Sequence, residues 1–417
     1  MKIRLLLLAM AWFGLCSSAA VADDWPQWRG PQRNGISNER GLLKQWPADG
    51  PALVWQAKDI GDGYSTPSVV GDRLYVMSNK GMDDEFVQAL DTKDGQQIWS
   101  VRVGNVGPNT ALQYPAARST PTIDGPLLFA LGSDGDLACL ETDSGNKVWQ
   151  KNLRSDFGGK PGAWAYSESP LVDGDLLVCT PGGKEATLVA LNKKTGETVW
   201  KSSTPEADLA NYASIIVVNA AGRKQYVQFL SKGLVGVDAK TGELLWRYDK
   251  SAKGSTANIP TPVAQQGFVY SSTGRGGGAL VELTSGGGQI EAKEVYFLPK
   301  LPNSIGGSVE VGGKLYGTNG QGLLCVEFAT GEVKWQNRCV GAGSVCYADG
   351  LIYVHGENGD MALVEATPEA YREKGRFTLP DQPDRGKSLA WPYPVIADGK
   401  LYIRDLGMLW CYDVKAK

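Results

Sequence analysis

The sequence predicts an all-β protein, an eight-bladed β-propeller built from four-stranded antiparallel blades. One eleven-residue pattern recurs, with a small residue first, an acidic or amide residue two positions on, Thr, Ser or Asp five on, Gly six on and Trp ten on, as in ALNKKTGETVW at 190–200. Five copies end at Trp99, Trp149, Trp200, Trp246 and Trp335. In addition, apolar segments that follow a turn recur at intervals of about 37 to 54 residues, which is typical of four strands per blade.

Residues 1–22 are predicted to be a secretory signal peptide. Lys2 and Arg4 precede the apolar run Leu5–Leu15, and Ala20-Val21-Ala22 forms a cleavage site. That run is too short to cross a membrane, and no later run approaches about 18 apolar residues. We therefore expect a periplasmic or secreted protein without a membrane span. No lipid anchor is expected at Cys16, because Leu15 is larger than the small residue that lipoprotein processing prefers.

The charge of the chain limits the classes of partner that it can bind, and its cysteine content limits the disulfides that it can form. Without Lys2 and Arg4 the chain has 40 basic and 45 acidic residues, a net charge of −5, which provides no basic surface for nucleic acid. Six cysteines remain after cleavage, and we expect those in the repeat or in similar strands to be small buried apolar residues. An exported chain permits disulfides, and Cys339 and Cys346 are the favoured pair because they are close in sequence.

The mature chain is predicted to open with a lead segment, residues 23–50. Its start, DWPQWRGP, holds Trp25 and Trp28 in a frame of Pro and Gly that suits neither a helix nor the interior of a sheet. We expect it to lie across the folded body with its indoles in grooves, as a packing element and not as a binding segment.

The propeller is predicted to occupy residues 51–417. Each of its eight cycles has a stretch rich in Ser, Thr and Pro, a short first strand, a turn with Gly, a second strand with a buried anchor, and a third strand that runs into the repeat motif. The second-strand anchors are Tyr75, Phe129, Val178, Tyr226, Tyr270, Tyr316, Tyr353 and Tyr402.

Three blades depart from the pattern. Blade five has Tyr296 or Phe297 where Trp would be, blade seven has Phe377, and blade eight stops without a fourth strand. The strand at Pro51–Ile60, in contrast, carries Trp55 but has no strands before it. We therefore expect this N-terminal strand to complete blade eight and close the ring, so that no unpaired edge is left.

The motif has a structural explanation. Its acidic or amide side chain can accept a hydrogen bond from the backbone two residues on, and its Gly takes the left-handed conformation. The indole then packs between neighbouring blades. The predicted structural docking residues are Trp55, Trp99, Trp149, Trp200, Trp246 and Trp335.

The spacing A-x-D-x-x-T-G-x-x-x-W, seen in ALNKKTGETVW and GVDAKTGELLW, resembles the tryptophan-docking motif of PQQ-like (quinoprotein-like) eight-bladed β-propellers, over about residues 51–417. One branch of that family comprises alcohol and sugar dehydrogenases that depend on pyrroloquinoline quinone (PQQ). Another comprises shorter, cofactor-free proteins such as the outer-membrane assembly factor BamB, and exported proteins named for their PQQ-like repeats. The DWPQWRGP start is similar to the last group.

No catalytic or metal-binding residue is assigned from the sequence. The resemblance to the dehydrogenases implies a Ca²⁺ held by carboxylate and amide oxygens, an Asp base and often a disulfide between adjacent cysteines, but the chain has no Cys-Cys pair. His355, the sole histidine, is predicted to be a polar turn residue after the second strand of blade seven, and no G-x-S-x-G motif is present. We therefore expect no cofactor. PQQ and calcium would be required only if the protein were a dehydrogenase of that branch.

The candidate binding site is the mouth of the central channel where the loops before the first strands meet. Three of these loops are long: Gly104–Ala117, Arg154–Ala165 and Pro380–Ala390. Aromatic and polar side chains around a concavity suit a small molecule or a peptide, although Arg118 and Glu168 could instead pair with each other. The residues predicted at this mouth are Tyr64, Arg118, Tyr166, Glu168, Tyr212, Asn258, Asn303 and Trp391.

Together these observations favour an exported, monomeric, non-catalytic scaffold of the BamB-like branch that binds a protein or a small-molecule ligand at the channel mouth. The alternative is an alcohol or sugar dehydrogenase dependent on PQQ and Ca²⁺. A carbohydrate-binding or carbohydrate-processing propeller is a third hypothesis, which paired carboxylates at the mouth would favour.

Overall fold

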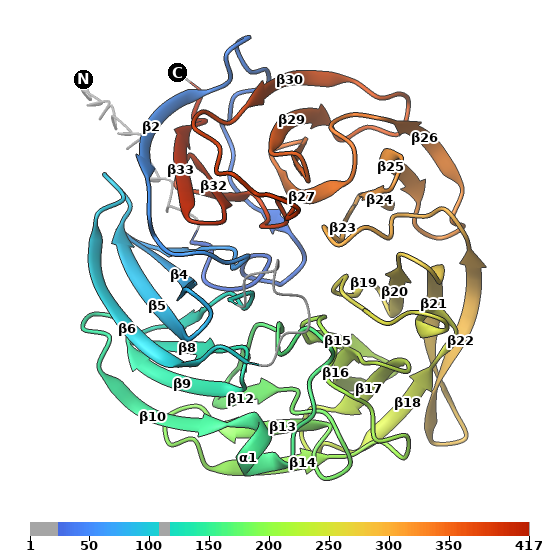
Figure 1. Ribbon diagram of the computed structural model, residues 1–417. Helices are drawn as coiled ribbons and strands as arrows, with labels where there is room; N and C mark the ends of the chain where they lie inside the picture. Colours follow the sequence, from blue (N-terminus) through green and yellow to red (C-terminus); the bar gives the residue numbers. More distant parts are fainter. Residues whose placement is uncertain (1–23, 108–116, 417) are drawn as a thin grey trace, which may run out of the picture.

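Eight antiparallel sheets surround a central axis in the computed structural model, which describes residues 24–107 and 117–416 (Figure 1). The predicted signal peptide and Cys16 lie outside these residues, as does most of the long loop predicted at Gly104–Ala117. The all-β, eight-bladed propeller predicted from the repeat is confirmed. The two short helical segments are α1 (Leu153–Phe157) and η1 (Lys250–Ala252), and α1 occupies the start of a stretch expected to be loop.

The first four blades follow one another along the chain, each with its first strand at the channel and its fourth at the rim. Their strands are β3 (Ser68–Val70), β4 (Arg73–Lys80), β5 (Asp84–Asp91) and β6 (Gln97–Asn105); β7 (Thr122–Asp124), β8 (Leu127–Leu131), β9 (Asp136–Glu141) and β10 (Lys147–Asn152); β11 (Leu171–Asp173), β12 (Leu176–Cys179), β13 (Leu188–Asn192) and β14 (Thr198–Ser202); β15 (Ile216–Ala220), β16 (Arg223–Phe229), β17 (Leu234–Asp238) and β18 (Leu244–Tyr248).

Blades five to eight continue the ring, and their second strands carry the predicted buried anchors as in the first four. Their strands are β19 (Val263–Gln265), β20 (Phe268–Thr273), β21 (Gly277–Gly286) and β22 (Gln289–Leu298); β23 (Ser308–Val311), β24 (Lys314–Asn319), β25 (Gly322–Glu327) and β26 (Val333–Asn337); β27 (Gly343–Ala348), β28 (Leu351–Gly356), β29 (Asp360–Glu365) and β30 (Glu373–Thr378); β31 (Val395–Ala397), β32 (Lys400–Asp405) and β33 (Met408–Asp413).

The ring is closed by a strand from the other end of the chain. Strand β2 (Ala52–Ala57) pairs antiparallel with β33, with Trp55 opposite Cys411. In Figure 1 the blue β2 lies beside the red β33 at the rim. Blade eight therefore has the order β2-β33-β32-β31, and the predicted closure is confirmed.

The repeated motif joins one blade to the next. Asp91 accepts a hydrogen bond from the backbone N–H of Lys93 at 2.7 Å, and Gly95 has a φ of 72°, which favours glycine. The indole of Trp55 lies directly over Gly95, where a Cβ would be 2.6 Å from the ring. Its Nε1 donates to the carbonyl of Thr92 at 2.8 Å, so the turn of blade one both receives and orients the indole of blade eight.

Blades four, five and seven show how the ring accommodates missing motifs. Trp246 of blade four donates to Gln225 of its own blade at 2.6 Å and packs with apolar residues of blade five. In blade five Tyr296, and not Phe297, takes the position of the indole: it is buried, and its hydroxyl donates to the carbonyl of Phe328 at 3.0 Å. Phe377 of blade seven packs against Gly50, just before β2.

Part of the lead segment, residues 25–37, lies in the central channel, a position that the sequence did not predict. Trp25 forms a bridge with Val69 of blade one, and the short strand β1 (Ile36–Ser37) pairs in parallel with β27, Ile36 opposite Tyr347. Residues 25–37 also contact the other six blades, through Ile123, Ser169, Ile215, Thr261, Ser308 and Tyr393. This segment, which crosses the middle of the ring in Figure 1, is called the channel loop below.

The six cysteines within the described residues are all buried and unpaired. The suggested disulfide between Cys339 and Cys346 is therefore wrong, while the expectation of small buried residues holds for Cys139, Cys325 and Cys411. Burial raises the pKa of Cys139 and of Cys411 to about 12, which keeps both thiols protonated at neutral pH.

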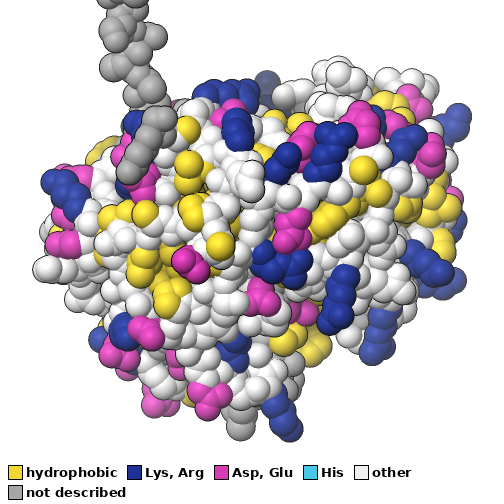
Figure 2. Space-filling model, turned by 90° about the horizontal axis from the view of Figure 1, so that it is seen from above, with side chains coloured by type: hydrophobic (Ala, Val, Ile, Leu, Met, Phe, Trp, Pro, Cys, Tyr) yellow, Lys and Arg dark blue, Asp and Glu magenta, His cyan; other side chains and the backbone are white. Residues whose placement is uncertain are grey.

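Basic and acidic side chains are interspersed on the face shown in Figure 2. Single aliphatic residues of the outer strands, such as Leu53 and Val54 of β2, are partly exposed between them. Across residues 24–107 and 117–416, no helix is long and apolar enough to span a membrane.

The contact between β2 and blade one gives a stability prediction. Replacement of Trp55 by Ala removes a buried indole at the closure of the ring and should lower the free energy of unfolding by about 3–5 kcal/mol. Val54→Ala, an exposed neighbour on the same strand, should change it by less than about 0.5 kcal/mol. Urea denaturation followed by circular dichroism measures both, and equal effects would contradict a special role for the closing indole.

Candidate functional site

A cavity of about 290 Å³ lies at one mouth of the channel. Its walls come from the loops that precede the first strands of seven blades, and Trp28 of the channel loop is added to them. We call it the aromatic cup, because six of its residues are Trp or Tyr. It is lined by Trp28, Tyr64, Arg118, Trp164, Ser167, Tyr212, Ala257, Ile259, Ile305, Trp391 and Tyr393.

The aromatic rings of the cup are held in pairs. Trp28 and Tyr393 meet edge to face with ring centroids 4.7 Å apart, and Tyr64 and Trp391 lie 4.8 Å apart. Trp164 and Tyr212 form a third pair at 5.8 Å. Edge-to-face and tilted contacts at these distances are favourable, so the rings support one another without a bound ligand.

Hydrogen bonds fix two of these pairs further. The indole of Trp28 donates to the hydroxyl of Thr261 at 2.9 Å, and the hydroxyl of Tyr393 donates to the carbonyl of Ile305 at 3.1 Å. The Tyr212 hydroxyl accepts from the backbone N–H of Trp164 at 3.0 Å. The walls are therefore largely preformed.

The channel loop closes the cup from below. Trp25 and Ile36 pair with Val69 and Tyr347, toward the ends of the first strands of their blades. Trp28, between them, lines the cavity at the opposite ends of the first strands. The loop thus rises through the channel and returns, with Trp28 near its turn.

Among the described residues, Arg118 is the one charged side chain that lines the cup. Its Nη1 donates to the carbonyl of Trp164 at 2.7 Å, and the acid that faces it is Glu85. Burial raises the pKa of Glu85 to about 7, although the N–H of Ser133 and the Arg118 charge act in the opposite direction.

Four of the eight residues predicted at the mouth line the cup, namely Tyr64, Arg118, Tyr212 and Trp391. The other four make contacts within the blades. The Tyr166 hydroxyl donates to the carbonyl of Pro181 at 2.8 Å, and the Asn258 side chain donates to the carbonyl of Leu230 at 2.6 Å. The backbone N–H of Asn303 donates to the carbonyl of Thr318 at 3.0 Å.

Glu168, the remaining predicted residue, is buried beside the channel loop. It accepts hydrogen bonds from the Thr180 hydroxyl at 2.6 Å and from Gln228 at 3.1 Å. Burial raises its pKa to about 7, and the cation that opposes this shift is Arg33 of the channel loop. Glu168 thus faces Arg33, whereas Arg118 faces Glu85.

Sequence reasoning missed seven residues of the cup. Three are aromatic: Trp28 was assigned to packing, Trp164 lies in the long loop after α1, and Tyr393 follows Trp391 by two positions. The positions of the loops could have indicated these residues. All of them other than Trp28 lie in the stretches that were predicted to precede the first strands. The others are Ser167, Ala257, Ile259 and Ile305.

The described residues of the cup do not include the ligand set of a PQQ–calcium centre. The eleven that line the cavity carry no carboxylate and no side-chain amide, the oxygen donors that Ca²⁺ requires. His355 lies within β28 and is fully buried, with Nδ1 2.9 Å from the carbonyl of Pro392, so the predicted turn position is wrong. Within the described residues, no group of three or more His, Cys, Asp or Glu is arranged to hold a metal ion.

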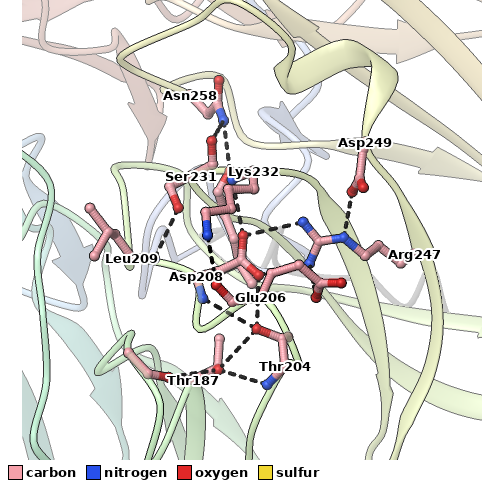
Figure 3. A network of polar contacts seen from close by, with 12 residues as sticks. Thr187, Thr204, Glu206, Asp208, Leu209, Ser231, Lys232, Arg247, Asp249 and Asn258 are labelled. Atoms are coloured by element: carbon pink, nitrogen blue, oxygen red, sulfur yellow. Dashed lines mark hydrogen bonds and ion pairs between the residues drawn. The ribbon is translucent and has the colours of Figure 1, made fainter.

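A polar network holds the loop that carries Tyr212 (Figure 3). Asp208 is fully buried and accepts from the Thr204 hydroxyl at 2.8 Å and from Arg247 at 2.7 Å. Figure 3 shows the Arg247 guanidinium between Asp208 and Asp249. On the other side of the loop, the N–H of Tyr212 donates to the carbonyl of Asn258 at 3.3 Å.

Comparison with known proteins gives one family. The sequence model described as outer membrane protein assembly factor BamB matches residues 35–163 and 84–337. Together these ranges cover well over half of the chain.

The individual relatives include assembly factors and dehydrogenases. The chain is 25% identical over 206 residues to the outer membrane protein assembly factor BamB of Burkholderia pseudomallei, covering 46% of this chain and 45% of the relative. It is 23% identical over 243 residues to the quinoprotein alcohol dehydrogenase PedH of Pseudomonas putida, covering 57% of this chain and 37% of the relative. The chain thus spans less than half the length of these two relatives.

Among solved structures, the crystal structure of BamB from Moraxella catarrhalis superposes with a TM-score of 0.62. The match covers 88% of this chain and 98% of that one at 15% sequence identity, so it supports the fold alone.

The network around Asp208 gives a mutational and a pH prediction. Burial raises the pKa of Asp208, but the hydrogen bonds from Arg247 and Thr204 lower it by more, so the net shift is downward. Its stabilisation is thus present above the pKa of an unfolded aspartate, about 3.9, and is lost as the pH falls through the lower folded pKa. Asp208→Asn should cost about 3 kcal/mol at pH 7 and flatten the acid limb of a stability–pH curve.

Glu206 is the matched control, because it contacts the same guanidinium at 3.0 Å but is more exposed. Glu206→Gln should cost less than about 1 kcal/mol. Thermal denaturation between pH 3 and 7 compares the variants. An Asp208→Asn protein with an unchanged acid limb would show that this carboxylate does not contribute to stability there.

Proposed function

The chain belongs to the family described as outer membrane protein assembly factor BamB, and on this premise we propose that it is an exported, non-catalytic binding scaffold of the cell envelope. Its ligand-binding site is the aromatic cup. The ligand is a protein or a small molecule that inserts an apolar group there.

The shape and chemistry of the cup carry this proposal. A concave site walled by Trp and Tyr, with few polar groups, is the usual form of a small-molecule site and of the centre of a protein interface. Among the described residues, six aromatic rings from the channel loop and four blades converge on one cavity. Because the rings are held by one another and by hydrogen bonds, little ordering has to accompany binding.

The alternatives receive less support from this site. A dehydrogenase dependent on PQQ and Ca²⁺ needs carboxylate and amide ligands, and the lining residues that the structure describes include neither. A carbohydrate-processing propeller would be favoured by paired carboxylates at the mouth, but Glu168 faces Arg33 inside the ring. The apolar walls suit an aliphatic or aromatic group better than a sugar.

Binding of a neutral apolar probe tests the cup. We expect N-phenyl-1-naphthylamine to bind one site of the wild-type protein with enhanced probe fluorescence. Ala257→Trp, which fills the cavity, and Trp391→Ala, which removes one wall, should each weaken binding by about tenfold or more. Val199→Ala, an exposed position on the outer strand β14, is the matched control and should bind like the wild type.

Two results would oppose the proposal. Probe binding that is unaffected by Ala257→Trp would place the apolar site elsewhere on the protein. Tight stoichiometric uptake of PQQ in the presence of Ca²⁺, with dye reduction by an alcohol or a sugar, would instead establish the dehydrogenase alternative.

A further inference from the structure

The charge of the aromatic cup specifies its ligand more closely than its shape does. Besides the six aromatic rings, the described lining consists of three aliphatic side chains, the hydroxyl of Ser167 and the guanidinium of Arg118. In that part of the lining, a bound molecule therefore meets one cationic group and no acidic one. The inference that follows rests on the proposed function, because it names the class of ligand that the cup binds.

Arg118 is held at the wall of the cup by the rings around it. Its Nη1 donates to the carbonyl of Trp164 at 2.7 Å, and the Trp164 indole packs against Tyr212. Tyr64 and Tyr212 are both close enough for their hydroxyls to interact with the charge of Arg118. The guanidinium thus lies among three aromatic residues that line the same cavity.

The apolar surroundings make this charge costly. Burial lowers the pKa of Arg118, yet an arginine keeps its proton at neutral pH. Glu85, the acid that faces Arg118, is not among the residues that line the cavity. A cation that apolar walls separate from water is stabilised by an opposite charge in the same cavity. An anionic group in the cup is therefore favoured over a neutral one.

The rings alone would suit a different class of ligand. Faces of Trp and Tyr attract ammonium groups through cation–π interactions. In this cup an ammonium group would share a small cavity with the guanidinium of Arg118, and none of the described lining residues is a carboxylate that would offset the repulsion. The sign of the one lining charge therefore opposes a cationic ligand.

We propose that the ligand of the aromatic cup is a small monocarboxylate with an apolar body, such as an aryl-substituted or a short alkyl acid. The apolar body lies among the aromatic rings, and the carboxylate lies at Arg118. A carboxylate matches the charge and the planar shape of a guanidinium. The cavity of about 290 Å³ is at the small end of small-molecule sites, which suits a compact acid.

Displacement of N-phenyl-1-naphthylamine at pH 8 by three naphthalene derivatives of similar size tests this preference. We expect 1-naphthylacetate to displace the probe at a concentration about tenfold lower, or lower still, than its neutral amide, because hydrogen bonds between charged groups are the stronger ones. 1-Naphthylmethylammonium should be the weakest competitor. An amide as effective as the acid, or an ammonium that displaces best, would overturn the proposal.

Two variants of the lining separate charge from shape. Arg118→Met removes the charge and keeps much of the apolar stem, so affinity for the acid should fall about tenfold while affinity for the amide stays nearly unchanged. Ile305→Ala, the matched change at an apolar position of the wall, should weaken acid and amide alike. An Arg118→Met protein that still prefers the acid would contradict the assignment.

Glu85→Gln tests the same charge with the opposite sign, even if Arg118→Met does not fold. With a pKa of about 7, Glu85 is mostly ionised at pH 8, and loss of its charge should strengthen binding of the acid severalfold without affecting the amide. Weaker binding of the acid in this variant would overturn the proposal. If neither the probe nor any of the naphthalenes binds the wild type, the proposed function itself fails, a result distinct from equal binding of acid and amide.

Discussion

The pairing of β2 with β33 is the contact on which the rest of the molecule depends. It joins the first strand of the ring to the last, and it sets the Trp55 indole over Gly95, so that blade eight meets blade one. Fourteen residues, 38–51, connect the channel loop to β2, so the loop and the closing strand belong to one N-terminal segment. One continuous segment thus forms the floor of the cup, pairs with β27 and completes the eighth blade.

The repeat predicted the ring because its residues make similar contacts with the neighbouring blade wherever the motif occurs. The motif turns, the second-strand anchors and the closing strand follow from spacing alone, and Phe377 could be assigned as a substitute indole. The choice between Tyr296 and Phe297 could not be made from the sequence, because it depends on which side chain reaches the turn of blade six.

The interior of the channel was harder to predict for a physical reason. The channel loop occurs once and meets a different residue on each blade, so no periodicity records its position. Half of the predicted mouth residues line the cup because the loops were correctly placed in the ring. The side chains of Glu168, Tyr166 and Asn258 make hydrogen bonds outside the cup, and a loop position alone does not reveal side-chain direction. The buried charges Arg29 and Arg33 gave no signal in the sequence beyond a polar loop.

The closure has a consequence for how the chain reaches its native state. Glu39, just after β1, accepts a hydrogen bond from the N–H of Gly399, 360 positions later. Contacts of such long range close a very large loop, and proteins rich in them fold slowly. Until the last blade has formed, both β33 and the first blades present open strand edges, and the segment that will seal the ring has no place to dock. The interval between synthesis and closure is therefore when this protein most needs protection from aggregation.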